Sequence, residues 1–92
     1  MTGYLIMAVR EARRCRQETH AGNGLLAMDR LCWAWRYLGK AESVPWHIRS
    51  TPGWRRSYAR AWAATDAVRC DLVRSFRLTA IVAATARHLA HA

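Results

Sequence analysis

The sequence predicts an all-α protein, a small bundle of three to four helices that ends in a long amphipathic helix. The chain has 92 residues, of which 52% are apolar and 23% charged, a balance typical of globular domains rather than of disordered basic tails. Its five Gly and two Pro cluster mainly at two places, which divides the chain into three long segments. Each segment carries apolar residues at helical spacing. We therefore expect residues 1–92 to form a single small helical domain.

The first predicted helix runs from Tyr4 to His20. On a helical wheel, one apolar face is formed by Leu5, Ala8, Ala12, Cys15 and Thr19. The opposite face carries Arg10, Arg13 and Arg14. The stretch Ala-Gly-Asn-Gly after this segment predicts its end, because glycine accepts the left-handed conformation of a helix C-cap.

The second predicted helix runs from Leu25 to Leu38, with Asn23 as its N-cap and Gly39 as its stop. Its apolar residues do not keep to one side. One stripe is Leu25, Met28, Cys32 and Trp35, and a second is Leu26, Trp33 and Tyr37. A helix that is apolar on most sides is expected to be central in a bundle, or to face a partner as well as its own core. We expect helix 25–38 to contact other protein subunits or further copies of this chain.

A connecting segment follows over residues 40–53. Ser43 before Pro45 and Thr51 before Pro52 each predict an N-cap followed by a first-turn proline. The residues Pro45 to Arg49 are expected to form a single helical turn.

The third predicted helix covers residues 52–91 and has the strongest phase in the chain. One continuous apolar stripe is formed by Trp54, Tyr58, Ala61, Thr65, Val68, Leu72, Phe76, Thr79, Ala83, Ala86 and Ala90. The far side carries Arg56, Arg60, Arg74 and Arg77. One straight helix of this length would reach about 60 Å, and the apolar pattern broadens after Arg77, so we expect a kink or turn near Ser75–Leu78.

The charge of the chain indicates an anionic partner. Lys plus Arg is 15 against six Asp plus Glu, a formal net charge of +9. All of these cations except Lys40 are arginines. The planar guanidinium forms two parallel hydrogen bonds with phosphate or carboxylate, which favours nucleic acid or an acidic protein surface. A genome rich in G and C would also enrich Arg and Ala, but it would not deplete the acids.

Enzymatic chemistry is not expected. No Ser or Cys lies in a glycine elbow, no carboxylates pair on one face, and the Gly-Asn-Gly stretch lacks the lysine of a phosphate-binding loop. No cofactor is expected. A zinc site normally takes close ligand pairs, and the only such pair is His88 and His91, so no metal site is expected either.

These observations favour a non-catalytic subunit that binds a nucleic-acid backbone without strong sequence specificity, within a ribonucleoprotein assembly. Small helical subunits of CRISPR effector complexes fit the same description, an analogy of shape and charge that no motif carries. Trp46 and Trp54 would stack on bases if they faced solvent, although the phase of Trp54 places it in the core. The predicted contacts are Arg56, Arg60, Arg74 and Arg77, supported by Arg10, Arg13, Arg14 and Arg49.

Other functions remain open. The content of Trp and Arg also suits a protein-binding module, such as a phage or plasmid inhibitor that docks on an acidic host surface. A helix-turn-helix factor is less favoured, because the segment between Gly39 and Gly53 exceeds a tight turn. A membrane-surface role ranks lower still, and no segment is long enough to span a bilayer. Three cysteines without close spacing or a signal peptide predict a reduced protein in the cytoplasm.

Overall fold

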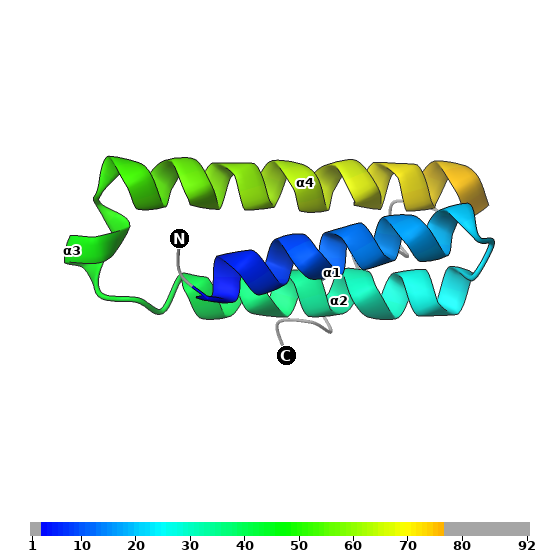
Figure 1. Cartoon of the computed structure of the whole chain (residues 1–92), viewed down its shortest axis with the longest axis horizontal. Helices are drawn as coiled ribbons and strands as arrows, with labels where there is room; N and C mark the ends of the chain where they lie inside the picture. The colour runs from blue at the N-terminus through cyan, green and yellow to red at the C-terminus, as the bar shows by residue number, and fades with distance from the viewer. Residues whose placement is uncertain (1–2, 77–92) are drawn as a thin grey trace.

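A computed structural model of the chain describes residues 3–76, and within them it confirms the all-α bundle. The helices are α1 (Gly3–His20), α2 (Gly24–Ala41), the single turn α3 (Trp46–Arg49) and α4 (Pro52–Phe76). Figure 1 shows that α1 and α4 run in the same direction and that α2, which lies between them in sequence, runs in the opposite direction. The single turn α3 lies at the end of the bundle where α4 begins. Each pair among α1, α2 and α4 is in contact, so none of the three long helices is surrounded by the others.

The core face of α1 is the predicted one. All five residues of that face are buried, namely Leu5, Ala8, Ala12, Cys15 and Thr19. The buried hydroxyl of Thr19 donates to the carbonyl of Cys15 at 2.8 Å, which satisfies its hydrogen-bonding capacity within the helix. Glu11 is also buried on α1, which the sequence did not predict.

The turn after α1 follows the glycine prediction. Gly22 has a φ of +81°, the left-handed conformation that favours glycine. The Asn23 amide donates to the Glu18 carbonyl at 2.8 Å and the Gly22 amide to the Thr19 carbonyl at 3.2 Å. These bonds satisfy carbonyls left open at the helix end. Asn23 does occupy the N-cap position of α2, but its side chain donates to Glu18 at 2.7 Å instead of capping the helix.

The core face of α2 differs from the predicted stripes. The buried residues are Ala27, Leu31, Ala34, Trp35, Leu38 and Ala41, whereas Leu25 and Leu26 are exposed. Apolar residues therefore lie on several sides of α2, as predicted, but neither predicted stripe marks the core face, because both followed the large side chains and left out the alanines. The alanine side chain adds little volume to a contact between helices, so a face rich in Ala lets neighbouring backbones approach closely. Among the predicted stripes, Met28, Cys32 and Tyr37 pack partly buried at the edge of the core.

The predicted stop at Gly39 was also wrong, since α2 continues to Ala41. Leu38 and Ala41 are fully buried, and their packing outweighs the cost of about 1 kcal/mol that glycine imposes inside a helix. Ser43 is not an N-cap: its hydroxyl donates back to the Lys40 carbonyl at 2.6 Å, and Pro45 holds the N-cap position of α3.

The expected single turn and the start of α4 are confirmed. α3 is one turn, and α4 begins at Pro52 directly after Thr51. The Thr51 hydroxyl oxygen accepts a hydrogen bond from the Trp54 amide at 3.4 Å, and the Thr51 carbonyl accepts from the Arg55 amide at 3.1 Å. This is the capping arrangement predicted from a threonine followed by a first-turn proline.

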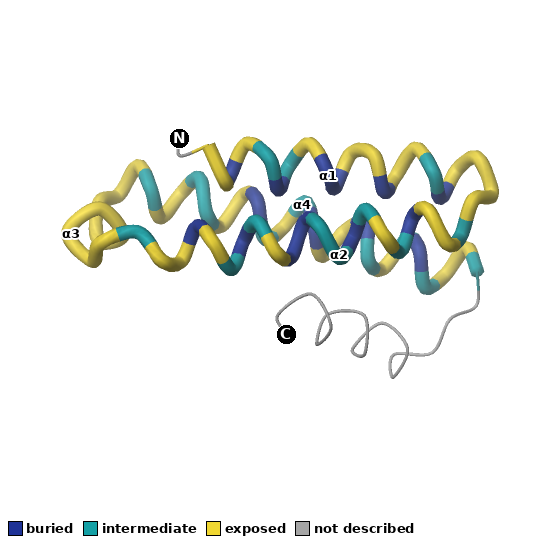
Figure 2. The backbone as a smooth tube through the Cα atoms, turned by 90° about the horizontal axis from the view of Figure 1, so that it is seen from below, coloured by how far each residue is buried: buried dark blue, intermediate teal, exposed yellow. Residues whose placement is uncertain are grey.

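The apolar stripe of α4 faces the core as predicted over its described length (Figure 2). Ala61, Thr65, Val68 and Leu72 are buried, and Trp54, Tyr58 and Phe76 pack against the core partly buried. α4 is helical through Ser75 and Phe76. The rest of the break predicted at Ser75–Leu78 lies outside the described residues, as does the continuation of the stripe through Thr79, Ala83, Ala86 and Ala90.

Candidate functional site

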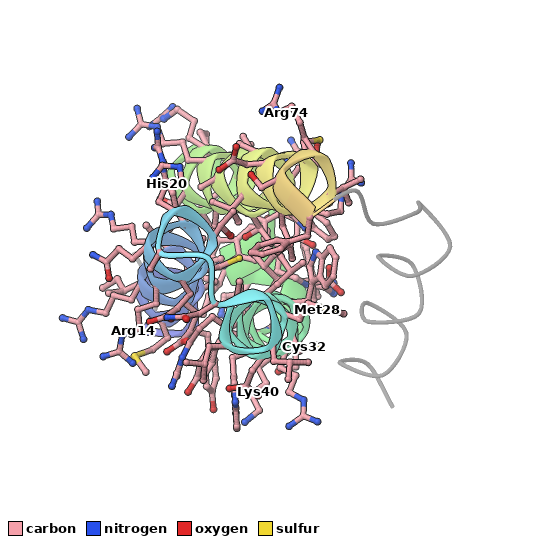
Figure 3. All side chains as sticks on the ribbon, turned by 90° about the vertical axis from the view of Figure 1, so that its right-hand side faces the viewer. Arg14, His20, Met28, Cys32, Lys40 and Arg74 are labelled. Carbon is pink, nitrogen blue, oxygen red and sulfur yellow. The ribbon has the colours of Figure 1, made fainter. Side chains whose placement is uncertain are left out.

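The predicted arginines lie at the surface wherever the structure describes them. Exposed residues include Arg10, Arg13, Arg14, Arg49, Arg56, Arg60 and Arg74. Arg77 lies outside the described residues, as do His88 and His91. Figure 3 looks along the bundle and shows nitrogen-bearing side chains extending outward from α1 and α4, with Arg74 pointing away from the core.

Cations form one row along α4 and a second row along α1. On α4, Arg56 and Arg74 are 18 residues apart, which is five full turns, so they lie on one line about 27 Å long. Arg60 is one turn beyond Arg56. On α1, Arg13 and Arg16 are separated by one turn and lie on the side of the helix that leads to His20.

A hollow of about 260 Å³ lies between the C-terminal parts of α1 and α4. It is lined by Arg16, His20, Ala67, Val68, Asp71 and Arg74. Arg60 belongs to the same side of α4, because Ala67 follows it by about two turns. We call this surface the α1/α4 arginine face, and define it as Arg13, Arg16, His20, Arg56, Arg60 and Arg74. His20 and Asp71, which are 51 residues apart in sequence, therefore meet on one surface.

One carboxylate, that of Asp71, lies on this face and pairs with two of its residues. Asp71 Oδ2 lies 3.2 Å from His20 Nε2, and Asp71 Oδ1 lies 3.5 Å from Arg74 Nη2. Among the described residues, the other four guanidinium groups of the face have no acid partner; these are Arg13, Arg16, Arg56 and Arg60. The positive charge of the face is therefore only partly compensated by the protein itself.

Three of the predicted contacts lie elsewhere. Arg14 Nη1 is 3.2 Å from Glu11 Oε1, in an ion pair beside the α1–α2 contact. Arg10 borders an apolar hollow near the start of α1. Arg49 is the last residue of α3, at the end of the bundle. The predicted contacts did not include Arg16 or His20, although the spacing of Arg13, Arg16 and His20 at i, i+3 and i+7 is a signal that could have found them.

Trp54 lies against the core, as its helical phase predicted, whereas Trp46 is exposed. Trp54 packs against the core and its ring stacks on Tyr58 with centroids 4.7 Å apart. Trp46 on α3 is 72% exposed. Of the five tryptophans, all of which lie in the described part of the chain, Trp46 alone is exposed.

Other chemistries find little support in the described part of the chain. No group of three or more potential metal ligands gathers there. Burial raises the pKa of the Cys15 thiol to about 11 and raises the pKa of Cys32 as well, so both thiols are poor nucleophiles at neutral pH. Among residues 3–76, no helix has the length and apolar character needed to cross a bilayer.

No protein-family model, curated protein or solved structure matches the chain.

Proposed function

We propose that this protein is a non-catalytic subunit that binds the phosphate backbone of a nucleic acid without strong sequence specificity. The observation that carries the proposal is the α1/α4 arginine face, where four guanidinium groups have no acid partner among the described residues. A row of cations about 27 Å long spans several successive phosphates of a strand. Phosphate contacts of this kind fix position but carry no sequence information.

The chemistry of the face suits phosphate. Each guanidinium offers two parallel hydrogen bonds to phosphate oxygens, and release of condensed counterions from the strand supplies much of the binding free energy. The Arg side chains extend from rigid helices, so their backbone positions need no ordering on binding. His20 adds a ring nitrogen at the end of the row, 3.2 Å from Asp71.

The setting that we propose is a cytoplasmic ribonucleoprotein assembly. All three cysteines of the chain are free thiols, in keeping with a reducing compartment. Leu25 is 88% exposed and Leu26 is also exposed, which leaves apolar surface at the start of α2 for neighbouring subunits or further copies of this chain.

Salt dependence is the first test. Binding to fluorescein-labelled oligonucleotides, followed by anisotropy from 50 to 300 mM salt, is expected to weaken as salt rises. For four to five neutralised phosphates, the slope of log affinity against log salt is expected to be about −3 for a single strand and about −4 for a duplex. Absence of binding at the lowest salt, or tight binding that salt leaves unchanged, would contradict the proposal.

Charge reversal is the second test. The double variant Arg56→Glu, Arg60→Glu is expected to lose binding while its thermal unfolding stays near that of the wild type, because both side chains are exposed. The matched control is Arg36→Glu, Lys40→Glu, which makes the same charge change at the same i, i+4 spacing on the exposed side of α2. Equal loss in the control would assign binding to net charge and not to this face.

A protein-binding module remains the second candidate function. A shallow apolar hollow on the outer side of α1 favours it, lined by Gly3, Tyr4, Ile6, Met7, Arg10 and Val44. Tyr4 and Ile6 are both exposed there. Affinity capture with nuclease treatment separates the two functions: a protein partner that is retained in stoichiometric amount after complete digestion supports the second candidate.

A further inference from the structure

Trp46 is the one tryptophan of this chain that the bundle leaves exposed. The other four are buried or half-buried, whereas Trp46 is 72% exposed on the single turn α3. Burial of an exposed indole removes a large apolar area from water, so a ligand that covers this ring gains binding free energy.

The backbone around this ring is firmly held. The amides of Ile48 and Arg49 both donate to the Pro45 carbonyl, at 3.0 and 3.1 Å, and the Ser50 amide donates to the Trp46 carbonyl at 2.9 Å. The Thr51 hydroxyl then donates to the Ile48 carbonyl at 2.7 Å while its oxygen caps α4. The position of Trp46 is therefore fixed relative to α4, although its ring makes no part of the core.

The residues around the Trp46 ring are mainly cationic, which indicates the kind of ligand that the ring would bind. Arg49 follows Trp46 by three residues and lies beside it on the surface of the turn. Arg55 and Arg56 are exposed near the start of α4, and α3 contacts α4. The nearest acid in sequence, Glu42, accepts a hydrogen bond from the Tyr58 hydroxyl. A flat aromatic ring among cations matches a ligand that carries both an aromatic base and a phosphate.

We propose that Trp46 stacks on an unpaired base, so that the ligand of this protein is a single strand and not a duplex. This inference rests on the proposed function and extends that function by naming the class of nucleic acid. The faces of bases in a duplex are covered by their neighbours, whereas in a single strand they are free to stack on an aromatic side chain. The strand would leave Trp46 past Arg49 and follow Arg56 and Arg60 along α4.

The test compares three substitutions of Trp46 on three 15-nucleotide probes: a single-stranded oligothymidylate, the same strand with all bases removed, and a duplex. Trp46→Ala is expected to weaken binding to the first probe about ten-fold, in the range of base–aromatic stacking, and to leave the other two unchanged. Trp46→Tyr retains a stacking ring and is expected to bind like the wild type. Trp46→Leu retains apolar bulk only and is expected to behave like Trp46→Ala.

Ile48→Ala is the matched control, because Ile48 is an exposed apolar residue of the same turn α3 but has no ring to stack on a base. Equal weakening of the single strand, the abasic strand and the duplex by Trp46→Ala would overturn the proposal, as would wild-type affinity in Trp46→Ala or Trp46→Leu. If reversal of Arg56 and Arg60 abolishes binding while every Trp46 variant binds normally, stacking fails and the phosphate interface stands. If the wild-type protein binds none of the three probes, both proposals fail.

Discussion

Glu11 on α1 accepts a hydrogen bond from Arg30 on α2, with 3.2 Å between Oε2 and Nη1. The Glu11 side chain is only 6% exposed, and its other oxygen pairs with Arg14 at 3.2 Å. A single buried acid therefore holds two guanidinium groups and joins the first two helices. It also compensates two arginines that would otherwise add to the positive surface.

Replacement of this acid should destabilise the bundle. Glu11→Ala leaves both guanidinium groups without their acceptor at the helix contact, and we expect the free energy of unfolding to fall by about 1–2 kcal/mol in urea titrations. Asp66→Ala removes an exposed acid that pairs with Arg69 on the same helix, and is expected to change stability by less than about 0.5 kcal/mol. Equal effects would mean that the Glu11 contact contributes nothing beyond a surface ion pair.

Core packing by α4 depends on Leu72. Its side chain is buried in the cluster that α4 shares with α1 and α2, so Leu72→Ala is expected to cost about 2–5 kcal/mol through lost burial and a residual cavity. Leu25→Ala, at an exposed site, should stay within about 0.5 kcal/mol of the wild type. Thermal unfolding followed by far-ultraviolet circular dichroism measures both changes, and a stable Leu72→Ala protein would show that the stripe of α4 is not core.

Removal of the carboxylate on the α1/α4 arginine face should strengthen anion binding. Asp71→Asn frees Arg74 and His20 from their shared acid, so affinity for a single-stranded oligonucleotide is expected to rise several-fold, with a salt slope steeper by about one phosphate. Asp66→Asn makes the same charge change about 140° around α4 and should have a smaller effect. A decrease in affinity on Asp71→Asn would show that Asp71 instead positions these cations for binding.

The stability of the fold should decline in alkali because of Cys15. Burial raises the pKa of this thiol from 9.0 to about 11, so between these values the folded protein keeps a proton that the unfolded chain has lost. The stabilisation is full below pH 9 and is lost as pH rises to 11, with a slope of up to about 1.4 kcal/mol per pH unit. Urea unfolding at several pH values should give wild-type and Cys15→Ala profiles that converge over this window. Profiles that run parallel would contradict it.

The periodicity of apolar residues was sufficient to predict which faces of α1 and α4 are buried and which are exposed. Leu5, Cys15 and Leu72 are buried where the wheel places them, and Arg56 and Arg60 are exposed. These assignments depend only on the phase of residues along one helix, which the order of residues fixes. The cap at Thr51 was predictable for the same reason, because a cap is made by residues within one turn.

Other features of the core and of the surface depend on which helices pack against one another, so the sequence did not predict them. The sequence by itself determined that residues 3–76 are mainly helical, that α1 and α4 each have one apolar and one cationic side, and that the balance of charge is strongly positive. Only the tertiary structure decided that Ala27 and Ala34 carry the core face of α2, that Glu11 is buried, and that Arg16 and His20 meet Asp71 and Arg74. A helical wheel gives the direction of a side chain around its own axis, but which helix lies in that direction, and how closely, is set by the packing of all three long helices together.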